Sequence, residues 1–123
     1  MRFLLFVACC AALAYGLFRP ESPPDLFDDS DKLMHLLAFG ALGLSARLAF
    51  IRIPGWLLWG VLLLIAPLLE WLQHEWQPYR QFSQADMLAN LLGVALAALG
   101  WCLVTLLWRW LRAQRGVDTP SAP

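Results

Sequence analysis

The sequence predicts an all-α membrane protein, a bundle of four transmembrane helices with both termini in the cytoplasm. Of its 123 residues, 60% are hydrophobic and 15% are charged, whereas a soluble domain is nearer half apolar and a quarter charged. The apolar residues fall into four long blocks separated by short polar segments. Nine Lys and Arg residues balance nine Asp and Glu residues, so the composition excludes a basic nucleic-acid-binding protein and a disordered chain.

Each apolar block has about the length of a membrane span, which needs about 20 residues to cross about 30 Å of hydrocarbon. The predicted spans are Phe3–Phe18, Leu33–Ile51, Gly55–Gln73 and Met87–Leu111. The first is short and follows Arg2, as in a signal peptide, but it lacks an A-x-A cleavage site, so we expect a retained helix. Residues 1–112 are therefore expected to form a single domain, and residues 113–123 a flexible cytoplasmic tail.

The distribution of Lys and Arg predicts the orientation, because cytoplasmic segments carry the excess of these residues. One side of the predicted bundle holds six of them: Arg2, Arg47, Arg52, Arg109, Arg112 and Arg115. The other side holds three: Arg19, Lys32 and Arg80. Both termini should then be cytoplasmic, and the loops after the first and third spans should face outward.

Costly polar residues gather at the outward ends of the spans. They are Asp31, Lys32, His35, Glu70, Gln73, Arg80, Ser83, Asp86 and Asn90. A charged side chain at mid-helix costs about 2.5–3.5 kcal/mol on insertion scales, and an ionisable cluster inside a membrane is by default a candidate functional site. Asp31 and His35 are four residues apart, as are Asp86 and Asn90, so each pair shares a helix face. If these faces converge, the bundle holds a polar pocket open to the outside.

Each of these residues also has a structural interpretation. Ser83 fits the N-cap of the fourth span, since its hydroxyl can accept from first-turn amides. Arg80 could pair with Glu70 or Asp86, and a buried histidine or asparagine is often an interhelical hydrogen-bonding residue.

Small residues predict close helix packing. Ala89, Gly93 and Ala97 form a ladder at four-residue spacing on the fourth span. Gly40 and Gly43 leave the surface of the second span without side chains, so that another helix can approach closely.

The order of these motifs resembles the VanZ-like family of small bacterial membrane proteins, which is associated with resistance to the glycopeptide antibiotic teicoplanin. The matching pieces are Asp31-Lys32-x-x-His35 with Phe39, then Glu70-x-x-Gln73, then Pro78-x-Arg80-x-x-Ser83-x-x-Asp86-x-x-x-Asn90-x-x-Gly93. The resemblance covers roughly Asp31 to Gly93. It implies a multi-pass protein of the bacterial inner membrane and the cell envelope, and it supplies a phenotype rather than a biochemical activity.

The predicted function is action at the outer face on a membrane lipid or envelope amphiphile with an anionic head group. Lys32, Gln73, Arg80, Ser83 and Asn90 would bind this substrate. The candidate catalytic residues, which would orient these groups or transfer protons, are Asp31, His35, Glu70 and Asp86. As an enzyme the protein would transfer or hydrolyse the head group, and as a non-enzyme it would bind or mask it.

Two other functions remain open at this point. In a structural or partner-binding membrane subunit, the polar residues would hold helices together. In a proton- or ion-coupled carrier they would form a pathway, although four short spans are few for a carrier. Asp31, His35 and Glu70 could form a metal site, but no dense His or Cys spacing supports it, so we expect neither metal nor cofactor. The three cysteines lie in apolar blocks and are expected to be wall residues.

Overall fold

The computed structural model describes residues 1–19, 27, 30–77 and 82–117. This part of the chain is all α, as the sequence predicts. It contains four helices: α1 (Arg2–Phe18), α2 (Ser30–Ala49), α3 (Gly55–Trp76) and α4 (Gln84–Val117). Each apolar block became one helix, with ends that differ from the predicted ones by a few residues. Arg80 lies outside the described residues.

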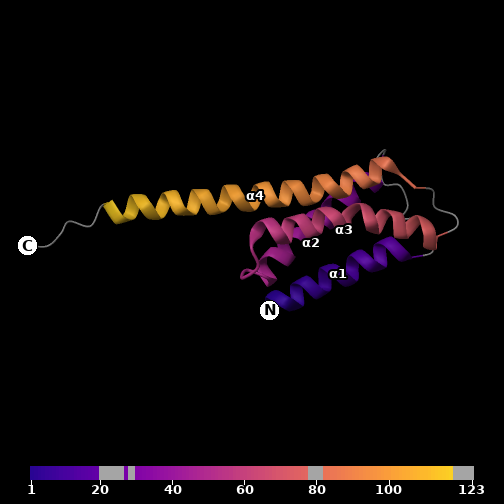
Figure 1. Ribbon diagram of the computed structural model, residues 1–123, viewed down its shortest axis with the longest axis horizontal. Coiled ribbons are helices and arrows are strands. Elements are labelled where there is room, and N and C mark those ends of the chain that lie inside the picture. The colour runs from indigo at the N-terminus through magenta and orange to yellow at the C-terminus, as the bar shows by residue number, and fades with distance from the viewer. Residues whose placement is uncertain (20–26, 28–29, 78–81, 118–123) are drawn as a thin grey trace, which may run out of the picture.

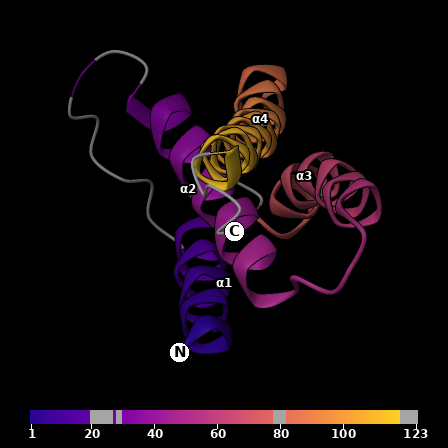
Figure 2. The ribbon, with the colours of Figure 1, turned by 90° about the vertical axis from the view of Figure 1, so that its left-hand side faces the viewer.

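Helix α2 forms the centre of the bundle (Figures 1 and 2). It packs more extensively against α4 than against any other helix, and α1 lies on it as well, while α3 packs mainly against α4. Buried apolar side chains of α2, α3 and α4 make up the core, with Phe39, Ala66 and Val94 completely buried. The C-terminal part of α4 projects beyond the other three helices (Figure 1).

The close packing of α2 against α4 depends on the small residues that the sequence singled out. A β-carbon at Gly93 would collide with the Leu36 carbonyl oxygen and would lie 3.0 Å from the Gly40 nitrogen. A β-carbon at Gly43 would lie 3.3 Å from the β-carbon of Ala97. The predicted small-residue ladder therefore lies at a backbone-to-backbone contact, which only glycine at position 93 permits.

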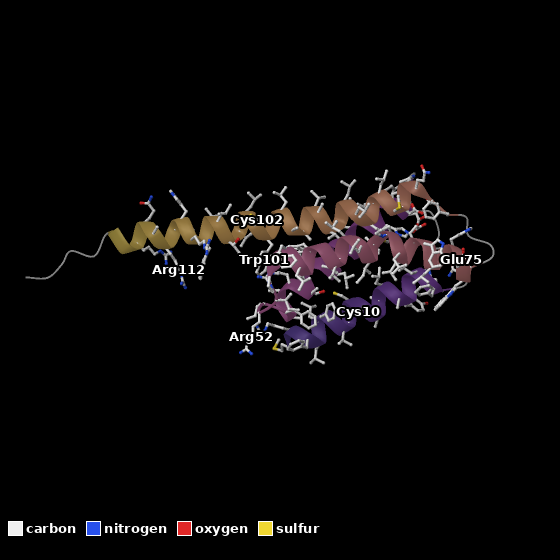
Figure 3. All side chains as sticks on the ribbon, in the orientation of Figure 1. Cys10, Arg52, Glu75, Trp101, Cys102 and Arg112 are labelled. Carbon is white, nitrogen blue, oxygen red and sulfur yellow. The ribbon has the colours of Figure 1, made fainter. Side chains whose placement is uncertain are left out.

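The turn between α2 and α3 is held by Arg47. Its Nη1 donates to the carbonyl oxygens of Phe50 at 3.2 Å and of Ile53 at 3.0 Å, and its guanidinium lies 5.5 Å from the Trp101 ring centroid. Both carbonyl groups follow Ala49, the last residue of α2, so Arg47 ties the turn to the end of this helix. In Figure 3, Arg52 in this turn and Glu75 in the last turn of α3 lie toward opposite ends of the bundle.

Two of the four helices are long and apolar enough to cross a membrane, α3 and the Gln84–Arg115 part of α4. Of the most apolar stretch of 18 residues in each helix, only 22% in α3 and 17% in α4 is buried inside the molecule. Most of the apolar side chains of these stretches therefore face outward. Helix α1 is a shorter apolar helix.

The predicted tail begins at Ala113, but α4 continues to Val117, so residues 113–117 are helical. Residues 118–123 lie outside the described part of the chain.

Candidate functional site

In Figure 1, α2 and α4 begin at the end of the bundle where α1 and α3 end. Polar side chains meet at this end. Asp31 and His35 come from the first turns of α2, and Asp86 and Asn90 from the first turns of α4. Because α2 and α4 approach so closely at Gly93, the faces that carry these side chains are pressed together. The polar faces of the second and fourth spans, whose convergence the sequence left as a condition, therefore lie against each other.

The centre of the site is a group of three side chains, Asp31, His35 and Asp86, here called the Asp–His–Asp cluster. Their ligating atoms all lie within 4.8 Å of one another. His35 Nε2 lies 3.7 Å from Asp31 Oδ1, which confirms the shared face predicted from their spacing. On its other side, His35 Nδ1 lies 2.9 Å from Asn90 Oδ1, so the ring bridges α2 and α4.

Two of the three side chains of this cluster are buried although they are polar. His35 and Asp86 are buried, Asp31 is partly exposed and Asn90 is completely buried. Buried polar groups are costly unless they are hydrogen-bonded. Asn90 Nδ2 has no hydrogen-bond partner within the described residues, so its amide is satisfied on one side only.

Ser83 has the capping role that the sequence allowed. Its hydroxyl accepts a hydrogen bond from the backbone N–H of Asp86 at 3.2 Å, which satisfies a first-turn donor of α4. The backbone N–H of Ser83 in turn donates to Glu70 Oε1 at 3.4 Å. Glu70, which is buried, therefore ties the end of α3 to the beginning of α4.

Gln73 acts on α1. Its Nε2 donates to the Leu17 carbonyl oxygen at 2.8 Å, and Gln77 Nε2 donates to the carbonyl oxygens of Leu17 at 3.1 Å and Arg19 at 2.8 Å. These bonds satisfy carbonyl groups that the last turn of a helix leaves without intrahelical partners. The structure thus gives Gln73, predicted to bind substrate, a contact that anchors α1 to α3.

A pocket of about 310 Å³ lies between α1 and α2 and reaches this site. Its wall is largely apolar, with Cys9, Leu13 and Leu17 from α1 facing Met34 and Ala38 from α2. Its polar lining residues are Arg19, Asp31 and His35. The apolar wall of the pocket therefore ends at two members of the Asp–His–Asp cluster, Asp31 and His35.

The structure connects most of the predicted site residues through two groups of contacts. Asp31, His35, Asp86 and Asn90 form the first, and Lys32 is exposed in the first turn of α2 beside them. Glu70, Ser83 and Gln73 form a second set of helix-end contacts. Arg80 lies outside the described residues.

Two residues that contribute here were missed from the sequence. Arg19 lines the pocket beside Asp31 and His35, although the sequence analysis used it only for orientation. The sequence contained an indication of this role, because Arg19 is a lone cation directly after an apolar block. Gln77 had no comparable signal, because its contact with α1 depends on how α1 and α3 are placed.

No protein family, curated protein or solved structure matches this chain in comparisons of its sequence and fold. The chemistry of the site therefore has to be argued from its own residues.

Proposed function

We propose that this chain is a VanZ-like, multi-pass membrane protein of the bacterial envelope that binds an amphiphile with an anionic head group. The observation that carries the proposal is the pocket between α1 and α2, whose apolar wall ends at Arg19, Asp31 and His35. An amphiphile has the same division, an apolar chain attached to a polar head. Ligand pockets commonly combine an apolar lining with a few polar groups that orient the ligand.

Exposed apolar side chains support a location in the membrane. Along α4, Leu88, Leu92, Leu96, Leu103 and Leu107 each expose more than half of their surface. A soluble molecule rarely exposes so continuous an apolar surface, whereas hydrocarbon makes it favourable. We propose that all four helices cross the bilayer, with both termini cytoplasmic and the site on the periplasmic or extracellular side.

The polar groups at the pocket suit an anionic head. The Arg19 guanidinium can make paired hydrogen bonds to a phosphate or carboxylate group. Lys32, which is exposed and lies outside the pocket lining, is a second cation in the first turn of α2. His35 is the candidate proton-transfer group, with Asp31 and Asp86 to orient it. Binding of the head group needs only the cations, so we propose binding as the basic activity. Transfer or hydrolysis of the head group would require proton transfer by His35 in addition.

A structural subunit is the second candidate, and specific contacts favour it. The His35–Asn90 contact and the Gln73–Leu17 hydrogen bond each join two helices. In such a subunit the polar end would hold the bundle together for a partner protein. Replacement of site residues would then lower stability without any specific effect on lipid binding.

The deciding experiment measures binding of a spin-labelled phosphatidic acid to the detergent-purified protein. Ala38→Phe fills the pocket and Arg19→Ala removes its cation, so each should reduce lipid binding at least fivefold. Matched controls are Ala14→Phe on the exposed side of α1 and Arg52→Ala at the other end of the bundle. Equal binding by all four variants and the unchanged protein would refute the proposal and leave the structural subunit.

The proposed topology has its own test. A periplasmic reporter enzyme inserted after Glu75, which lies toward the polar end (Figure 3), should be active. Activity of a cytoplasmic reporter at the same position would contradict the orientation.

A further inference from the structure

The Asp–His–Asp cluster also has the composition and spacing of a cation site. Because its three ligating atoms lie within 4.8 Å of one another, some point lies within about 2.8 Å of all three. Metal–nitrogen and metal–oxygen bonds are about 2.0–2.2 Å long. Side-chain shifts of under about 1 Å would therefore bring two carboxylate oxygens and one imidazole nitrogen onto a common ion.

The orientation of His35 favours this use. Asn90 Oδ1, 2.9 Å from Nδ1, can only accept a hydrogen bond, so Nδ1 carries the hydrogen and the neutral ring presents a lone pair at Nε2. That nitrogen is the one directed at Asp31. Metal-ligating histidines are held in this way, with the second ring nitrogen donating to an oxygen that fixes the ring.

The charge of the cluster gives a second reason, which rests on the proposed function. Asp31 and Asp86 would repel the anionic head group proposed for the adjoining pocket, and like charges this close raise each other's energy. A divalent cation between them removes the repulsion and offers open positions to head-group oxygens.

We propose that Asp31, His35 and Asp86 hold one divalent cation that prefers oxygen and nitrogen ligands, such as Mn²⁺ or Zn²⁺. The ion lies at the polar end of the pocket between α1 and α2. Asn90 is a positioning residue that orients His35. The role of the ion in binding the head group rests on the proposed function, whereas ion binding itself does not.

The test is a titration of the detergent-purified full chain with Mn²⁺ alone, followed by electron paramagnetic resonance. We expect one saturable site, displaced by Zn²⁺, and a nitrogen coupling from one imidazole in the spin-echo spectrum. His35→Gln and Asp86→Asn should each weaken binding at least about tenfold, since even outer residues of metal sites contribute that much. The chain offers matched controls in His74→Gln and Glu75→Gln in the last turn of α3, which should bind Mn²⁺ as the unchanged protein does.

Absence of a saturable site, or equal weakening by the control variants, overturns the proposal. If the site variants fail to fold, the imidazole coupling in the unchanged protein decides, because a spectrum without it excludes His35 as a ligand. A final arm separates this proposal from the proposed function by adding the spin-labelled phosphatidic acid with and without Mn²⁺. Tight Mn²⁺ binding without lipid binding would support the cation site and refute the proposed binding of an amphiphile.

Discussion

Replacement of Gly93 by alanine tests the helix contact on which the site depends. The added β-carbon would collide with the Leu36 carbonyl oxygen, and a backbone atom cannot move away by changing a side-chain rotamer. Leu36 is adjacent to His35, and Gly93 lies one turn after Asn90. Separating α2 from α4 here should therefore also lengthen the 2.9 Å contact between His35 and Asn90.

The magnitude follows from two opposing effects. Alanine in place of glycine stabilises a helix interior by about 1 kcal/mol, whereas overpacking costs about 1–3 kcal/mol. Because the clash is with backbone, we take the upper value and expect Gly93→Ala to lower the free energy of unfolding by about 2 kcal/mol. Gly100 is the matched control on the same helix, since a β-carbon there meets nothing within 4 Å.

The assay is unfolding of both variants by sodium dodecyl sulfate in mixed micelles, followed by circular dichroism. Gly100→Ala should be unchanged or more stable by up to about 1 kcal/mol. If Gly93→Ala proves as stable as Gly100→Ala, the close contact between α2 and α4 is wrong, and so is the placement of the Asp–His–Asp cluster.

Three further experiments test the polar contacts. In a double-mutant cycle, His35→Ala and Asn90→Ala should show a coupling of about 0.6–1.7 kcal/mol, and additive effects would mean that the two side chains do not interact. Gln73→Leu leaves the Leu17 carbonyl with fewer donors, at a cost of about 1 kcal/mol because a neighbouring glutamine keeps one bond, and faster amide hydrogen exchange in the last turn of α1 should report it. Ser83→Ala should cost about 0.5–2 kcal/mol in thermal unfolding, whereas Ser83→Asp, which keeps an accepting oxygen, should not.

The sequence by itself determined how many helices form and which side of each carries polar residues. Four apolar blocks became four helices, as expected if they lie in hydrocarbon as proposed, where a segment has to hydrogen-bond its own backbone. The four-residue spacings of Asp31 with His35 and of Asp86 with Asn90 placed each pair on one face, since that spacing equals about one helical turn. The position of Ser83 allowed a capping role beside the predicted role in substrate binding, and the structure shows the cap.

The tertiary structure decided which of these faces meet. Helical periodicity determines the direction of a side chain relative to its own axis, but it contains no information about which helix lies next to it. The contact between His35 and Asn90, which are 55 positions apart, and the entry of Arg19 into a pocket with Asp31 both depend on that choice of neighbours. At the α2–α4 contact, the choice depends on the absence of a side chain at Gly93, where two helix backbones come within reach of each other.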